Sequence, residues 1–230
     1  MRIAFKISFF ALIIFFSLGV NCLHEEQTDT ARALWTDCHL QDKISLEVFN
    51  TALSGSLRIE NLKKANILTI IDYSKASSVK RFFVIDTEKR KLLYHTYVAH
   101  GKNSGEYRPV RFSNLSGSLQ SSLGFFLTGE TYMGENGYSM KLEGLEQDIN
   151  DNARERDIVI HGADYVSEEY ITKYGRLGRS WGCPALPLEL SKEIIDLISN
   201  GSCLFVYAAD SFYLKNSNFT TETKNVHKVK

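Results

Sequence analysis

The sequence of 230 residues carries no net charge, because 27 lysines and arginines balance 27 aspartates and glutamates. Without a basic excess there is no electrostatic attraction to polyanions, and we expect no nucleic-acid partner. The chain lacks internal repeats, clusters with the spacing of zinc ligands, and a glycine-rich phosphate loop before a helix. We therefore expect no metal and no cofactor. The length favours one medium-sized domain.

A long hydrophobic run occurs only at the N-terminus. Arg2 and Lys6 precede an apolar stretch over residues 7–20. This stretch fits a secretory signal peptide and is short for a membrane span, which needs about 20 residues. We predict a signal peptide over 1–22 and an exported protein of the periplasm or cell envelope. An uncleaved anchor, or lipidation at Cys22, is the alternative, and would give peripheral membrane association.

Cysteine is scarce, and the count bears on reactivity. Four cysteines are present, and removal of a signal peptide that includes Cys22 leaves Cys38, Cys183 and Cys203. An odd number in an oxidising compartment leaves at least one free thiol or an intermolecular bridge. Pairing of Cys38 with Cys203 is one arrangement that keeps Cys183 free, and the connectivity stays open at this stage.

Short runs rich in Ile, Val, Phe and Tyr predict strands at 67–71, 81–86, 92–99, 123–127, 139–142, 158–161 and 204–207. Apolar spacing and capping residues predict helices at 44–55, 167–173 and 187–198. The links between strands are too brief for regular strand–helix–strand crossovers. We expect a mainly β fold with a few helices. The predicted divisions are a helical or irregular segment over 23–64, one domain over 65–210, and a disordered polar tail over 211–230.

Two segments carry residues suited to acyl transfer. Residues 158–162 read as a buried strand that ends in His161 and Gly162, and residues 178–184 place Cys183 in a glycine-flanked loop just before a helix. A free cysteine, with a pKa of about 8.5, is mostly protonated at neutral pH, and a neighbouring imidazolium lowers that pKa. We predict Cys183 as nucleophile and His161 as base. Taken singly, each residue is more often a buried structural one.

The pattern of His161-Gly162 followed by Ser180-Trp181-Gly182-Cys183 resembles the HG and S-x-G-C signature of YkuD-like L,D-transpeptidases. More closely, the chain is similar to the murein L,D-transpeptidase catalytic domain family. The likeness extends over about 65–208 and is carried by residues 71–74, 98–101, 112–114, 121–124, 136–139, 158–163 and 178–185.

The resemblance implies a β-sandwich-like L,D-transpeptidase catalytic domain that acts on peptidoglycan stem peptides. It implies that Cys183 attacks the peptide, forms a thioester and releases the terminal D-alanine. A second stem's amine then forms a cross-link, or water gives L,D-carboxypeptidase activity. His161 matches the general base, the Gly162 carbonyl its orienting acceptor, and Ser180 a hydroxyl near the site. The amides of Gly182 and Cys183 match the oxyanion donors.

Other positions are expected to bind substrate. Tyr138 matches a tyrosine that lines the pocket of the family. Ala185 stands where the common pattern has arginine, and we expect Arg179 to replace that guanidinium. Trp181 stands where histidine or lysine is common, and it either forms a wall of the substrate pocket or simply packs against the protein. His100, which also precedes a glycine after a strand, is the second choice for the base.

Two other functions fit the sequence. A peptidoglycan-binding module of the same fold without catalysis is suggested by Ala185 and Trp181. A redox role would pair Cys183 with Cys38 or Cys203.

Overall fold

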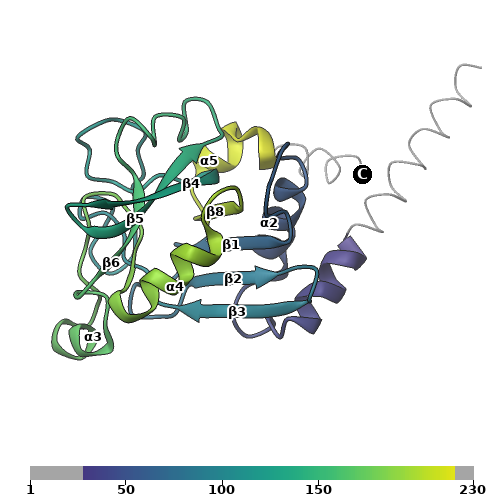
Figure 1. Ribbon diagram of the computed structural model, residues 1–230, viewed down its shortest axis with the longest axis horizontal. Coiled ribbons are helices and arrows are strands. Elements are labelled where there is room, and N and C mark those ends of the chain that lie inside the picture. The colour runs from purple at the N-terminus through teal and green to yellow at the C-terminus, as the bar shows by residue number, and fades with distance from the viewer. Residues whose placement is uncertain (1–27, 221–230) are drawn as a thin grey trace, which may run out of the picture.

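The computed structural model describes residues 28–220 (Figure 1), so the predicted signal peptide lies outside the described residues. The strands are β1 (Ile67–Asp72), β2 (Phe82–Asp86), β3 (Lys91–Thr96), β4 (Gly124–Gly134), β5 (Gly137–Gly144), β6 (Val159–Ala163), β7 (Ala185–Pro187) and β8 (Cys203–Tyr207). The helices are α2 (Leu46–Ser56), α3 (Glu168–Tyr174), α4 (Leu188–Ile198) and α5 (Ser211–Asn216), and residues 28–37 are also helical.

All eight strands belong to one hydrogen-bonded sheet in the order β3-β2-β1-β8-β4-β5-β6-β7. The pairs β1–β8 and β6–β7 are parallel, and the other neighbours are antiparallel. The expected mainly β fold with a few helices is therefore confirmed. Strand β8, near the C-terminal end of the described chain, joins the N-terminal strands to the β4–β7 half that carries the predicted site.

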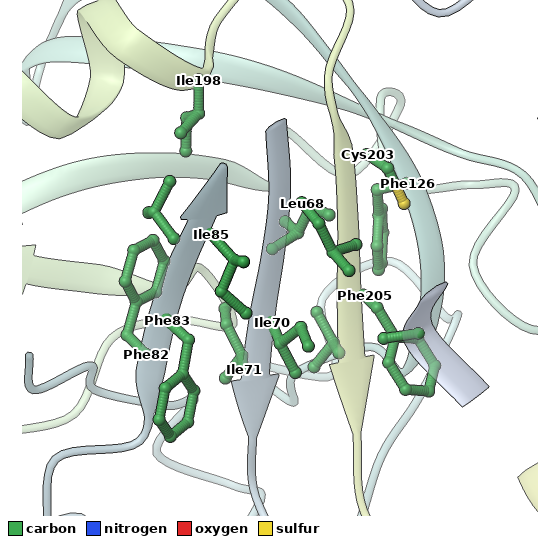
Figure 2. Close-up of a cluster of buried hydrophobic side chains, with 14 of the residues drawn as sticks. Leu68, Ile70, Ile71, Phe82, Phe83, Ile85, Phe126, Ile198, Cys203 and Phe205 are labelled. Atoms are coloured by element: carbon green, nitrogen blue, oxygen red, sulfur yellow. The ribbon is translucent and has the colours of Figure 1, made fainter. Parts of the chain in front are cut away.

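The core lies around β1, β2 and β8. Every residue of β1 and β2 is buried, so both faces of this part of the sheet are covered. Figure 2 shows Leu68, Ile70, Phe83 and Phe205 on neighbouring strands of this core, to which Ile198 from α4 also belongs. Full burial of each such side chain stabilises the fold by about 1.5–3 kcal/mol. This core holds the central strands rigidly.

Helix α4 covers the face of β6 that is opposite to the predicted base. It begins at Leu188, directly after Pro187, which is the last residue of β7 and the N-cap of the helix, with φ −52° and ψ 131°. A Cβ placed on Gly162 would come 2.4 Å from Ser191 Oγ on α4, so only glycine permits this close packing. His161, the preceding residue, therefore points to the other face.

The predicted disordered tail is wrong for residues 211–220, where the chain forms α5 and a further short helical turn. Asp210 caps α5 by accepting a hydrogen bond from the Tyr213 amide at 2.8 Å. Tyr213 is buried and its hydroxyl donates to Glu146 at 3.2 Å. The polar composition concealed this segment because its order comes from tertiary contacts. Residues 221–230 lie outside the described range.

Within residues 28–220, no helix has both the length and the apolar character that crossing a bilayer requires.

Candidate active site

Cys183 lies in the loop that leads into β7, with its side chain partly exposed. Its sulfur is 3.5 Å from the Val159 amide, which donates to it, and 3.5 Å from the Asp157 carbonyl, to which the thiol donates. Cys38 and Cys203 are buried, and all three thiols are free. The disulfide between Cys38 and Cys203 is therefore absent from the described residues.

His161 is buried on β6, with 4% of its surface exposed. Its Nδ1 lies 3.0 Å from the Gly162 carbonyl oxygen, and because a carbonyl only accepts, Nδ1 carries the proton. The unprotonated Nε2 makes no hydrogen bond within the described residues. This is the tautomer that a general base needs, and it is held by the Gly162 carbonyl that the family resemblance implies.

The register of β6 with β7 sets the relation between the two groups. His161 pairs with Ala185 in the parallel ladder, and Cys183 lies two residues before that ladder begins. The Val159 amide donates to the Cys183 sulfur at 3.5 Å, so the sulfur lies beside the start of the strand that carries His161. No hydrogen bond joins the sulfur to the imidazole in the described structure.

The pKa directions of both groups favour their neutral forms. Burial raises the pKa of the Cys183 thiol, against the smaller lowering by the Val159 amide and the Arg156 charge. Burial lowers the pKa of His161, against the smaller raising by its bond to the Gly162 carbonyl. The resting pair is thus thiol and imidazole. The thiolate–imidazolium pair expected from sequence is not what these environments favour, because the loss of surrounding water disfavours the charged form of each group.

Hydrogen bonds fix the loop around the thiol. Ser180 Oγ donates to the Cys183 carbonyl at 2.5 Å and accepts from the Gly182 amide at 3.1 Å. The Gly182 amide is therefore occupied within the loop and is not free for an oxyanion. The Cys183 amide lies beside its own sulfur, helps to lower the thiol pKa, and is the remaining donor of the predicted pair.

A neighbouring loop packs against this turn. The Gly182 carbonyl accepts from Ser121 Oγ at 3.1 Å, and the same hydroxyl accepts from the Gly101 amide at 3.0 Å. Gly182 has φ 134°, where a side chain is strained, and a Cβ there would lie 3.0 Å from the Gln120 carbonyl oxygen. Glycine at 182 is thus required both by its backbone angle and by the close approach.

A comparison with known families supports the resemblance seen in the sequence. The family described as L,D-transpeptidase catalytic domain matches residues 40–207. The chain belongs to this L,D-transpeptidase family. None of the curated proteins searched matches the chain.

Solved structures similar to this L,D-transpeptidase domain share little sequence with it. An L,D-transpeptidase from Mycobacterium smegmatis is 15% identical, with a TM-score of 0.39, over 62% of this chain and 59% of that one. The helical cell shape determining protein of Campylobacter jejuni is 12% identical, with a TM-score of 0.41, over 70% and 57%. An Enterococcus faecium L,D-transpeptidase is 14% identical, with a TM-score of 0.37, over 62% and 50%. The chain thus spans less than two thirds of each.

Arg156 is a part of this L,D-transpeptidase site that sequence reasoning missed. Its Nη1 donates to the Ser113 carbonyl and Ser122 Oγ, both at 2.6 Å. Its Nη2 donates to the Gln120 carbonyl at 2.9 Å and Ser118 Oγ at 3.2 Å. The guanidinium thus ties the loop that packs on Gly182 to the turn before β6. In the sequence, Arg156 lies in a charged stretch that gives no signal beyond a solvent-exposed turn.

Tyr132, and not Tyr138, shares a face with His161. Ser139 pairs with His161 on one side and Tyr132 on the other, so these three side chains lie on one face. Burial, the Asp157 carboxylate and the nearby Cys183 raise the pKa of Tyr132. Tyr138 faces α4, where its hydroxyl donates to Asp196 Oδ1 at 2.5 Å. Alternation along β5 turns the Tyr138 side chain to the face opposite His161, so its expected place in a substrate pocket stays a prediction.

The remaining predicted residues divide into exposed and buried ones. Trp181 is 74% exposed, with Lys102 Nζ 5.6 Å from its ring centroid, so it is open to a ligand beside Cys183. Arg179 Nη1 lies 3.3 Å from both the Lys102 and the Gly105 carbonyl oxygens, which occupies one edge of its guanidinium.

His100 is fully buried and bonded at both ring nitrogens. Nδ1 accepts from Arg81 Nη2 at 2.9 Å, and Nε2 donates to the Gly105 carbonyl at 3.2 Å. Burial and the Arg81 charge lower its pKa to about 3, so it is neutral. The expectation that His100 binds substrate or acts as base is therefore wrong: it belongs to the support beneath the site. Within residues 28–220, no group of three or more His, Cys, Asp or Glu is placed to hold a metal ion.

Proposed function

We propose that this chain is a cysteine-dependent L,D-transpeptidase that acts on peptidoglycan stem peptides through a thioester acyl-enzyme. The observation that carries the proposal is a partly exposed free thiol at Cys183 whose sulfur contacts the Val159 amide of β6, the strand that carries the base tautomer of His161. Membership of the L,D-transpeptidase family supports the substrate class.

In the proposed acylation, the sulfur of Cys183 bonds to the carbonyl carbon of the L-configured residue while Nε2 of His161 accepts the thiol proton. The Cys183 amide donates to the developing oxyanion. His161 returns the proton to the amine of the leaving D-alanine as the C–N bond breaks. Because both groups are neutral at rest, the proton moves only as the bond to carbon forms.

The thioester is resolved in one of two ways. Attack by the amine of a second stem forms a cross-link, and attack by water gives L,D-carboxypeptidase trimming. We propose export through the segment 1–22 and action at the periplasm or cell envelope, which is where such substrates lie.

Acylation by a carbapenem, read by intact mass, tests the proposal. The wild type should gain one covalent adduct, Cys183→Ala should gain none, and His161→Ala should react far more slowly. Purified protein incubated with sacculi should yield cross-linked or trimmed muropeptides. Normal sacculus binding with neither an adduct nor altered muropeptides would instead identify a catalytically inactive binding module.

A redox role for Cys183 has less support. Cys38 and Cys203 are both buried in the hydrophobic core, and neither is bonded to Cys183. Thiol counting on the air-exposed protein checks this point, and three free thiols in residues 28–220 are expected.

A further inference from the structure

Two loops next to the active-site cysteine carry an excess of positive charge. Residues 101–111 and 175–182 contain five lysines and arginines but only one acidic residue, Glu106, which pairs with Arg176 at 3.5 Å. The cations of these loops that form no ion pair within residues 28–220 are Lys102, Arg108, Arg111 and Arg179. Because the chain as a whole is neutral, this excess is a local property of the two loops.

The same two loops expose large apolar side chains. Trp181 is 74% exposed, Val110 is 60% exposed and Tyr107 is 57% exposed. Large apolar groups that gather on a surface mark places where a protein binds a partner or a membrane. We call the exposed surface of residues 101–111 and 175–182 the basic loop surface.

Contacts between the two loops make them one surface. The Lys102 amide donates to the Ser180 carbonyl at 2.8 Å, and Arg179 Nη1 lies 3.3 Å from the Lys102 carbonyl oxygen. Lys102 Nζ also lies 5.6 Å from the ring centroid of Trp181. An ammonium group and an exposed indole are therefore neighbours, although they are far apart in the sequence.

Hydrogen bonds also fix the turn that carries Tyr107 and Val110. The amides of Val110 and Arg111 both donate to the Ser104 carbonyl, at 2.9 Å and 3.0 Å. The Tyr107 carbonyl accepts from the Ser77 amide at 2.8 Å. The basic loop surface thus has a fixed backbone, and a partner that binds it does not have to order the loops first.

This mixture of groups fits the surface of a bilayer better than a soluble polyanion. A soluble polyanion attracts the cations but leaves the exposed apolar side chains in water. A bilayer with anionic lipids offers phosphates to the cations, and its interfacial layer favours tryptophan and tyrosine. Long basic side chains such as that of Lys102 reach phosphates while an aromatic neighbour enters the same layer.

We propose that the basic loop surface binds the surface of a membrane that contains anionic phospholipids. Trp181, Tyr107 and Val110 enter the headgroup layer, and the four unpaired cations contact lipid phosphates. The contact is made by the folded domain and is separate from the N-terminal apolar segment. Because Trp181 precedes Cys183 by two residues, binding holds the thiol close to the membrane. Only this last consequence rests on the proposed function.

Quenching of Trp181 by lipids that carry a nitroxide near the headgroup tests the contact in the full chain. The chain has two tryptophans, and Trp35 is half-buried, with Nε1 donating to the Ile44 carbonyl at 2.9 Å. The emission of Trp181 is the difference between the wild type and Trp181→Phe. On vesicles of phosphatidylcholine and phosphatidylglycerol, Trp181 emission should shift to the blue and be quenched, and Trp35 emission should change little. On phosphatidylcholine alone, quenching should need much more lipid.

Removal of charge should weaken the contact in steps. Arg108→Gln should raise the concentration of anionic lipid at half-maximal Trp181 quenching about fivefold, and Arg108→Gln/Arg111→Gln should raise it about thirtyfold. The Arg108 side chain forms no hydrogen bond within residues 28–220, so the single variant removes charge without disturbing the loop. Lys63→Gln/Lys91→Gln is the matched control, because it removes two exposed cations outside the basic loop surface, and it should stay within twofold of the wild type.

Several results would overturn the proposal. Vesicle binding without quenching of Trp181 would place the contact elsewhere in the chain. Equal shifts in the double variant and its control, or no shift in the arginine variants, would show that this surface has no specific role. Binding of soluble polyphosphate without Trp181 quenching on vesicles would instead identify a polyanion site. Cys183→Ala keeps the surface and should be quenched like the wild type, so failure of the proposed acyl transfer would leave this result unchanged.

Discussion

The carbonyl oxygen of Gln120 accepts a hydrogen bond from Nη2 of Arg156 at 2.9 Å, and the same oxygen would lie 3.0 Å from a Cβ on Gly182. One guanidinium therefore positions the loop against which the cysteine turn packs. The charge of Arg156 also lowers the pKa of Cys183, although burial raises it by more.

Arg156→Gln should loosen that loop and remove the cation near the thiol. Carbapenem acylation is expected to fall about tenfold, and the pH profile of thiol alkylation should move upward. The profile is measured by the rate of iodoacetamide labelling of Cys183 from pH 6 to 10. If Arg156 only held the fold together, the variant would have a lower protein yield or stability, and the pH profile of Cys183 labelling would stay unchanged.

Arg154→Gln serves as the control for that variant. Arg154 lies two residues away and pairs with Glu130 at 2.7 Å on the exposed surface. Its loss is expected to change the labelling profile little, because exposed ion pairs contribute about 0–1 kcal/mol and Cys183 does not depend on this one. An equal shift in both variants would refute the specific role of Arg156.

Gly182→Ala should disrupt the site more than its small size suggests. Its φ of 134° is strained for any residue with a Cβ, at a cost of about 1–3 kcal/mol, and the added atom meets the Gln120 carbonyl. We expect acylation to fall by more than tenfold in intact-mass time courses. Gly117 also has a positive φ, of 72°, but a Cβ added there would meet nothing within 4 Å. The control variant Gly117→Ala should therefore keep its acylation rate. An equal loss of acylation in the two variants would mean that backbone strain alone, without the contact to Gln120, explains the effect.

The pH dependence of Cys183 should reflect its burial. Burial raises its pKa above the ordinary value of about 8.5, so iodoacetamide labelling should still be rising with pH beyond that value. His161→Ala should move this profile little, because a neutral imidazole contributes no charge to hold a thiolate. Acylation should nevertheless drop by about 10²–10⁴, since the base is lost. A wild-type profile centred well below 9 that moves upward in His161→Ala would instead demonstrate an ion pair.

His100 should make stability depend on pH. Its pKa is about 3 in the folded chain and near 6.5 when unfolded, so between these values the unfolded chain binds the extra proton. Stability should therefore fall as pH drops from about 6.5 toward 3, by at most about 1.4 kcal/mol per pH unit. His100→Gln should flatten this dependence in urea denaturation measured at several pH values. Parallel curves for the two proteins would contradict the assignment.

Much of the fold was predictable from local pattern. The runs at 67–71 and 82–86 form strands because they are rich in isoleucine, valine and phenylalanine, which suit a sheet that is buried on both faces. Helix α4 follows from Pro187 and its apolar stripe. Strand β7 was missed because three residues carry no periodicity, and α5 because its polar composition hides the buried Tyr213.

The sequence by itself determined the family, the cysteine, the histidine and the glycine that orients it, because these depend on residue type and local spacing. Only the tertiary structure decided which neighbours matter. Alternation along β5 turned Tyr138 away from the face of His161, and pairing with Ser139 put Tyr132 on that face. Packing buried His100 and brought Arg156 to the loop that packs against Gly182. The pKa directions of Cys183 and His161 also came from burial, which depends on the whole chain closing around them.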